Sequence, residues 1–356
     1  MLPIFRNLLV LASACMLAGC GTLYVAQAAR GQMQLLNARE PIPRVLADPS
    51  VDAKLKTRLE EVRVAREFAW RELGLPNNKS YTSYADLKRE YVTWSVVATP
   101  EFSIEPREWC FPIVGCVSYR GYFRESSAEK YAARLEAEGL DVMVGGVPAY
   151  STLGKFNDPI LNTMMSYGDD ELASIIFHEL SHQVVYVPGD TSFNEAFAVA
   201  VEQEALARWL KFRGREQELG RFLRRRERQA ESLAVVARYR KELTQLYQLP
   251  VPLGEMRDRK RAVFARLVGE LRALGEKYGV ESSLAAELDG RPNNARLASL
   301  ATYYECVPGF RRMLAEQGHD LPRFYDAVRA LAKLPREQRR GRVCAVPALR
   351  PVGETQ

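Results

Sequence analysis

The sequence has little histidine, with three among 356 residues, and it has no Cys-x-x-Cys pair. It contains no internal repeat or low-complexity tract, which excludes a repeat protein. Its net charge of +6 is small for this length and does not indicate nucleic-acid binding. A hydrophobic content of 47% with 26% charged residues is instead typical of a folded globular protein.

The N-terminal apolar stretch Leu8–Leu17 is too short to span a bilayer, which takes about 20 residues. With Arg6 before it, this stretch suits a secretion signal. It runs into Leu17-Ala18-Gly19-Cys20, which resembles a bacterial lipobox. The resemblance implies cleavage before Cys20, lipidation of Cys20 and, with Gly21 next, a lipid-anchored protein at the periplasmic face of the outer membrane. An ordinary signal peptide with an incidental cysteine is the alternative.

Four cysteines remain once Cys15 leaves with the signal and Cys20 carries lipid. An even number in an exported chain predicts disulfides, and four cysteines allow three pairings. Proximity in the sequence favours Cys110–Cys116 and Cys306–Cys344. A metal ligand or nucleophile among the four is the alternative.

The chain divides into four segments on this basis. We expect a signal peptide over residues 1–19, a lipidated tether over 20–48, a single domain over 49–346 and a tail over 347–356. Residues 23–36 have a helical composition, which Glu40-Pro41-Ile42-Pro43 interrupts.

The periodicity predicts an α+β fold. An amphipathic helix covers about 52–73, and β-rich runs at 91–99, 117–123 and 141–150 predict a small, mostly antiparallel sheet with a helix over 127–138. A helix that opens at Asp169-Asp170-Glu171 ends at Pro188-Gly189. The chain after residue 190 is predicted to be helical, over 193–212, 216–248, 256–278, 294–305, 309–316 and 321–333.

Two of the three histidines lie four residues apart, in His178-Glu179-Leu180-Ser181-His182. Residues i and i+4 share a face of a helix, so both imidazoles can bind one metal ion at about 2.0–2.1 Å. This is the H-E-x-x-H pattern of zinc peptidases, in which the glutamate serves as general base. Two core histidines bonded to neighbouring groups are the structural alternative.

A catalytic zinc ion takes three protein ligands and keeps one open position. Glu195, which begins a second helix after a short turn, is the candidate for the third ligand of one Zn²⁺ ion. Ser192-x-x-Glu195 also fits a capping box, in which Glu195 would bond to backbone instead.

The histidine motif followed by Asn194-Glu195-Ala196-Phe197-Ala198 resembles the gluzincin metallopeptidases, above all the zinc aminopeptidases. The resemblance implies a zincin-like fold, with His178, His182 and Glu195 as zinc ligands and Glu179 as general base. Glu202 matches a carboxylate that orients a ligand histidine through its other ring nitrogen.

The whole chain also resembles a proteobacterial lipoprotein family described as "putative aminopeptidases". The matching residues are Gly19-Cys20, Tyr24, Gln27-Ala28, Gly31-Gln32, Leu35-Leu36, Arg39, Tyr150-Ser151-Thr152-Leu153-Gly154, both metal motifs, Asn293-Asn294-Ala295 and Ala301-Thr302-Tyr303. This resemblance implies a peptide substrate and attachment to the membrane through Cys20, with no nucleic acid as partner. The oligomeric state stays open.

The substrate-binding residues are less clear, because the G-x-M-E-N strand that holds the free amine in aminopeptidases is missing here. The corresponding edge-strand candidate is Gly145–Thr152, of which Ala149, Tyr150, Ser151 and Thr152 would pair with substrate backbone. Asp158 is the nearest acid that could hold an ammonium group; a turn residue before Pro159 is the alternative.

The expected reaction is amide hydrolysis by a metal-bound water, with Glu179 as general base. Tyr303, with Tyr304 in reserve, is the candidate donor to the oxyanion; a buried core tyrosine is the alternative.

Three other functions stay open. They are an envelope metalloendopeptidase, a non-catalytic binding module with this fold, and a binder of anionic lipid through the arginine-rich segment 221–228, which otherwise forms a solvated helix face.

Overall fold

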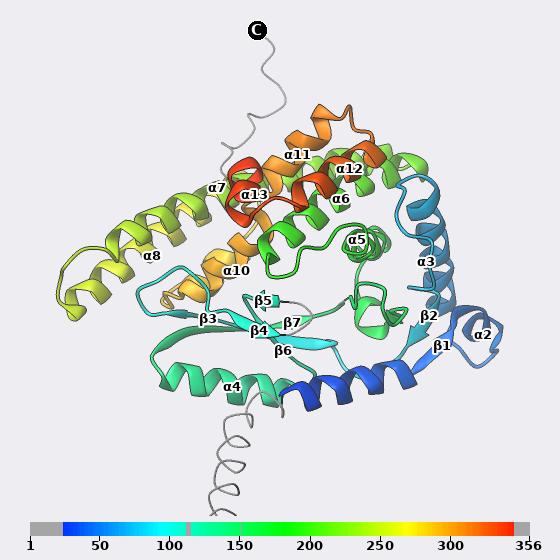
Figure 1. Ribbon diagram of the computed structural model, residues 1–356, viewed down its shortest axis with the longest axis horizontal. Helices are drawn as coiled ribbons and strands as arrows, with labels where there is room; N and C mark the ends of the chain where they lie inside the picture. The colour runs from blue at the N-terminus through cyan, green and yellow to red at the C-terminus, as the bar shows by residue number, and fades with distance from the viewer. Residues whose placement is uncertain (1–23, 112–114, 150, 345–356) are drawn as a thin grey trace, which may run out of the picture.

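The computed structural model describes residues 24–111, 115–149 and 151–344. The fold is α+β, as the sequence predicts, with helices predominating over small sheets. Figure 1 shows helix α5 (Asp169–Ser181) end-on near the centre of the molecule, with a small sheet beside it and helices around both. The signal segment, Cys20 and the tail over 347–356 lie outside the described residues.

The main core forms where three long helices meet. Helix α3 (Ala53–Arg71) begins at Asp52, whose carboxylate accepts the backbone N–H groups of Lys54 and Leu55. Its apolar residues recur every three or four positions and are buried against α5 and α6 (Thr191–Phe212). The predicted amphipathic helix therefore forms one wall around the centre of the molecule.

The central sheet has the order β6-β3-β7 and is antiparallel throughout. Its strands are β3 (Thr93–Pro100), β6 (Arg120–Tyr122) and β7 (Leu140–Val147). One face packs on α4 (Glu125–Ala137), where Trp94, Val96 and Val142 are buried. Helix α10 (Asn294–Tyr304) lies against β3 and β7, on the other side of the sheet from α4 (Figure 1).

The three predicted β runs do form one antiparallel sheet, but other short strands form two more sheets that the sequence did not predict. Strands β1 (Arg39–Pro41), β2 (Ser83–Ala85) and β8 (Ile160–Leu161) form a second sheet, in which β2 and β8 are parallel. Strands β4 (Trp109–Phe111) and β5 (Gly115–Val117) form a hairpin. The predicted strand 117–123 thus splits between the hairpin and the central sheet.

Residues 24–48 pack closely against the rest of the protein. Residues 24–37 are helical, and β1 leads into the short helix α2 (Ile42–Ala47), which has Pro43 in its first turn. Leu35, Ile42 and Val45 are each at most 3% exposed and belong to the main core. The folded body therefore begins close to the proposed lipidation site.

Helices α7 (Glu216–Leu246) and α8 (Leu253–Lys277) form a long hairpin, drawn at the upper left of Figure 1, with its own apolar core. The short helix α9 (Ser283–Leu288), which the sequence did not predict, packs against α8. In the arginine-rich segment of α7, Arg221, Arg224 and Arg225 are exposed. Lipid binding by this segment stays a prediction.

The last helices cover α6 on the side away from the sheet (Figure 1). They are α11 (Val307–Glu316), α12 (Leu321–Ala332) and the unpredicted α13 (Arg336–Val343).

Cys306, just before α11, is bonded to Cys344, just after α13, and Cys110 is bonded to Cys116 across the β4–β5 hairpin. Both disulfides favoured by proximity are therefore present.

The predicted end of α5 was wrong. The helix stops at Ser181, not at Pro188-Gly189, because the backbone changes there to tighter turns with hydrogen bonds between residues three apart. The Ser181 hydroxyl donates to the carbonyl of His178 at 2.6 Å, and the N–H of Val184 donates to the carbonyl of Ser181 at 2.9 Å.

Among the described residues, no helix is both long and apolar enough to cross a membrane.

Candidate metal centre

The two motif histidines and Glu195 meet between α5 and α6. His178 lies in the last turn of α5, and His182 is the residue that caps this helix. The Nε2 atoms of His178 and His182 lie 3.5 and 3.8 Å from Oε2 of Glu195. The three candidate ligand atoms all lie within 4.8 Å of one another, so the structure brings these predicted residues together.

The turn between the two helices aims Glu195 at the histidines. Asp190 caps α6 by accepting the N–H of Phe193, so the helix begins before Ser192 and the capping-box alternative does not apply. The Asn194 side chain donates to the carbonyl of Val187 and accepts its N–H, both at 2.8 Å. Sequence reasoning assigned no role to Asn194, although it directly precedes Glu195 in the motif.

Glu202 lies two turns after Glu195 and reaches the far side of the His178 ring. Its Oε2 is 3.0 Å from Nδ1 of His178, and its Oε1 accepts the hydroxyl of Ser174 at 2.8 Å. Both ring nitrogens of His178 thus face a carboxylate. This contact holds the ring with Nε2 toward Glu195, which is the orientation that a metal ligand requires.

The protonation states of His182 and Glu195 suit a cation, whereas His178 has to lose a proton before its Nε2 can bind one. Burial lowers the pKa of His182 to about 4, so its imidazole is neutral and keeps a lone pair. Burial alone would raise the pKa of Glu195, but the neighbouring His182 and His178 outweigh this effect, and the pKa lies below its usual value. Burial opposes protonation of His178 as well, yet its bonds to Glu195 and Glu202 raise its pKa well above the usual value.

Glu179 lies beside this cluster, and its carboxyl group ionises less readily than that of an exposed glutamate. Burial raises its pKa to about 7, the neighbouring His178 opposes the rise, and the charges of Glu195 and Asp158 add to it. A carboxyl group with a pKa near 7 can both take and return a proton close to neutral pH.

The donor set fits a divalent cation. Four ligands at about 2.1 Å in a tetrahedron stand about 3.4 Å apart, close to the two separations from Glu195. Two imidazole nitrogens and one carboxylate oxygen are a ligand set that zinc accepts. Among the described residues, the buried Nδ1 of His182 has no hydrogen-bond partner, so only His178 has the supporting contact.

Four tyrosines from separate segments lie near enough to the carboxylates to be affected by their charge. Burial raises the pKa of Tyr119, Tyr186, Tyr81 and Tyr304, and the charge of Glu195, Glu179 or Glu202 contributes in each case. Tyr303 lies in α10, but its side chain is outside the described residues. Sequence reasoning named Tyr304 as a reserve and missed the other three, which no local motif distinguishes.

The predicted substrate-binding residues form a loop after β7. Tyr150 lies outside the described residues, and Ala149 packs against the main core. Asp158 is 2% exposed, and its carboxylate accepts the N–H and the hydroxyl of Thr152 at 2.9 and 2.6 Å. The structure therefore uses Asp158 to hold this loop, and ammonium binding by Asp158 stays a prediction.

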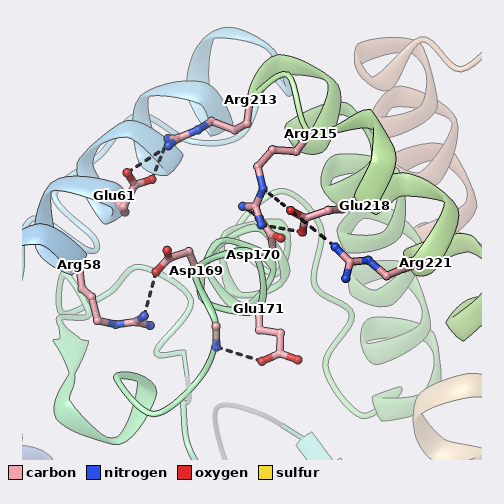
Figure 2. Close-up of polar contacts among 10 residues, drawn as sticks. Arg58, Glu61, Asp169, Asp170, Glu171, Arg213, Arg215, Glu218 and Arg221 are labelled. Carbon is pink, nitrogen blue, oxygen red and sulfur yellow. Dashed lines mark hydrogen bonds and ion pairs between the residues drawn. The ribbon is translucent and has the colours of Figure 1, made fainter. Parts of the chain in front are cut away.

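Charged residues hold the far end of the histidine helix, as Figure 2 shows. Arg58 of α3 pairs with Asp169 at 2.8 Å, and Arg215 pairs with Asp170 at 2.7 Å. Glu171 accepts the N–H of Gly168 at 3.0 Å. Acids in the first turn also interact favourably with the helix dipole. These contacts link α5 to its neighbours at the end opposite the histidines.

We expect Glu202→Ala to weaken metal binding by about 10–100-fold, because His178 loses the partner that orients its ring. A chelator-competition titration of the purified protein measures this change. Glu204→Ala is the matched control, since Glu204 lies on the same helix but bonds to Arg208 and His319 instead. Equal metal affinity in the two variants would show that Glu202 does not support the site.

Comparison with known families gives one match. A family model described as "Putative aminopeptidase" matches residues 23–343, a span that includes the histidine motif, Glu195 and Glu202. No curated protein and no solved structure matches the chain.

Proposed function

The chain belongs to the "Putative aminopeptidase" family, and from this premise we propose that it is a zinc-dependent peptidase that acts as an aminopeptidase. The observation that carries the proposal is the cluster of His178, His182 and Glu195, whose candidate ligand atoms lie within 4.8 Å of one another. Glu179, with its pKa near 7, lies beside that cluster.

Three residues would hold the cation in this proposal: His178 and His182 through Nε2, and Glu195 through a carboxylate oxygen. A bound zinc ion would polarise the scissile carbonyl and lower the pKa of a bound water to about 7. Glu202 keeps His178 in the orientation for binding.

Glu179 moves the protons of the reaction. Its carboxylate takes a proton from the attacking water and delivers it to the nitrogen of the leaving amine, so the peptide bond breaks without a free amide anion. Tyr303 is the proposed donor to the developing oxyanion. A missing donor of this kind typically costs a factor of about 10²–10³ in rate.

The proposal extends to the class and the location of the protein. We assign the α5–α6 arrangement to the zincin-like fold of the gluzincin peptidases, with residues 49–346 as the peptidase domain. Residues 1–19 would leave as a signal peptide, and lipid on Cys20 would attach the protein to the periplasmic face of the outer membrane. The close packing of residues 24–48 would then keep the domain near that membrane.

One observation favours a second candidate, an envelope endopeptidase. An aminopeptidase needs a group that binds the free amine of its substrate, and Asp158 already accepts bonds from Thr152. The two candidates differ in a simple way. An aminopeptidase cleaves only peptides with a free N-terminus, whereas an endopeptidase also cleaves blocked peptides.

The test combines metal analysis with free and blocked fluorogenic peptides. We expect about one zinc ion per chain, hydrolysis that stops when a chelator removes the metal, and recovery when zinc is added back. Cleavage of free peptides alone supports the aminopeptidase, and cleavage of blocked peptides supports the second candidate. Stoichiometric metal without any hydrolysis would indicate a non-catalytic binding module.

A further inference from the structure

A hollow of about 160 Å³ lies on the face of the central sheet opposite α4. Its lining includes Val97 and Ser95 of β3, Met143 and Val147 of β7, and Tyr119 from the segment between β5 and β6. Of these residues, only Val147 belongs to the edge strand that the sequence predicts to bind substrate. The motifs did not indicate the hollow itself.

Strand alternation creates this hollow. Ser95 pairs with Gly145 and Val97 with Met143, so these side chains and Val147 point to the same face of the sheet. The opposite face is filled by the core against α4. Gly145 has no side chain, which leaves room between its larger neighbours on this face.

Helix α10 borders the hollow with Ser299. The start of α10 is bonded to β7, since the N–H of Asn294 donates to Asp141 at 2.7 Å. The buried Lys260 donates to the same carboxylate oxygen at 2.6 Å. Helix α10 is therefore held against the sheet beside the hollow.

Tyr119 both lines the hollow and lies near the candidate metal centre. The charges of Glu195 and Glu179 both act on the Tyr119 phenol, which is close enough to the centre to sense them. The hairpin before Tyr119 also touches the turn between α5 and α6, since a Cβ on Gly115 would lie 2.6 Å from the backbone nitrogen of Gly189. The hollow and the candidate metal centre therefore share Tyr119 as a neighbour.

The lining selects for uncharged, apolar groups. Val97, Met143 and Val147 supply apolar surface, three serine hydroxyls add some polarity, and none of its described lining residues carries a charge. A charged side chain placed there would find no oppositely charged partner among the lining residues, which makes its burial costly. For comparison, an apolar cavity of about 150 Å³ in another protein binds benzene.

We propose that this hollow binds an apolar side chain of the peptide substrate, of leucine or phenylalanine size, next to the scissile bond. This inference rests on the proposed peptidase function and adds a substrate class to it. It predicts a preference for large apolar residues over alanine, lysine and glutamate at one position of the peptide.

Two leucine substitutions on β7 test the proposal. Gly145→Leu fills the hollow, and its Cβ would meet only the flexible end of Met143, at 3.0 Å. Val144→Leu is the matched control, because Val144 is 37% exposed and points to the opposite face of the same strand. Met143→Ala is a second variant that enlarges the hollow, in case Gly145→Leu folds poorly.

Binding and hydrolysis are measured separately on the full chain. Calorimetry on the zinc-loaded Glu179→Gln protein uses peptides with alanine, leucine, phenylalanine, lysine or glutamate on either side of the scissile bond. We expect the leucine and phenylalanine peptides to bind about tenfold tighter than the others. Gly145→Leu should remove this preference, Val144→Leu should keep it, and Met143→Ala should shift it toward phenylalanine.

The outcomes separate the two proposals. A preference that is absent, or that survives Gly145→Leu and does not change in Met143→Ala, overturns the inference, even where the unsubstituted protein hydrolyses peptides. The preference without hydrolysis by the unsubstituted protein supports the hollow as a binding site and contradicts the peptidase function. Neither binding nor hydrolysis would overturn both.

Discussion

Glu179→Gln is expected to lower the rate of peptide hydrolysis by a factor of about 10²–10⁴ while the protein keeps its metal. Glutamine has the size of glutamate but cannot accept a proton from water. Glu179 is not among the three residues whose atoms converge on the candidate metal position, so the donor set stays complete. Metal analysis and steady-state kinetics on the same purified sample measure both effects.

Glu171→Gln provides the matched control for this substitution. Glu171 is an exposed glutamate in the first turn of the same helix, and its contact is with the N–H of Gly168. A glutamine oxygen can accept that bond as well, so we expect unchanged activity. If Glu179→Gln hydrolyses peptides as fast as Glu171→Gln does, the proposed proton transfer by Glu179 is wrong.

Arg339→Met is expected to lower the free energy of unfolding by about 3–5 kcal/mol, because it leaves a buried carboxylate without its partner. Asp190 is 1% exposed, and Nε and Nη2 of Arg339 contact its Oδ2 at 2.9 and 2.7 Å. Asp190 also caps α6, five residues before Glu195. The substitution should therefore weaken metal binding too. Urea unfolding and the chelator-competition titration measure the two effects.

Arg336→Met on the same helix is the control for stability. The Arg336 side chain is 48% exposed and pairs with Glu108 at 3.7 Å, a surface contact worth about 0–1 kcal/mol. Adding Asp190→Asn to Arg339→Met should recover part of the loss, because it removes the unpaired charge. If Arg339→Met destabilises no more than Arg336→Met, the buried pair does not hold this part of the fold.

Local patterns predicted the long helices well. The sequence predicted both α3 and α7. A helix of several turns repeats its apolar pattern often enough for the pattern to be recognised. The short helices α9 and α13 were missed, since one or two turns carry little pattern. Their positions depend on packing against longer helices.

The strands show where such patterns fail. The run 117–123 is rich in β-forming residues, yet Val117 ends β5 and residues 120–122 form β6, which belongs to a different sheet. The strand β2 has only three residues and finds its partners, β1 and β8, more than 40 and 70 positions away. Pairings of this kind follow from the tertiary structure and leave no periodic signal in a short segment.

The amino-acid sequence alone determined which residues are candidates for the metal centre. The spacing of His178 and His182 and the Asn194-Glu195 pair indicate it, because helical geometry converts short spacings into shared faces. Only the tertiary structure decided that Glu195 reaches the histidines, that Glu202 orients one of them, and that a hollow lies next to Tyr119. Those contacts join segments tens of residues apart, and the packing of α6 on α5 and of α10 over the sheet brings them together.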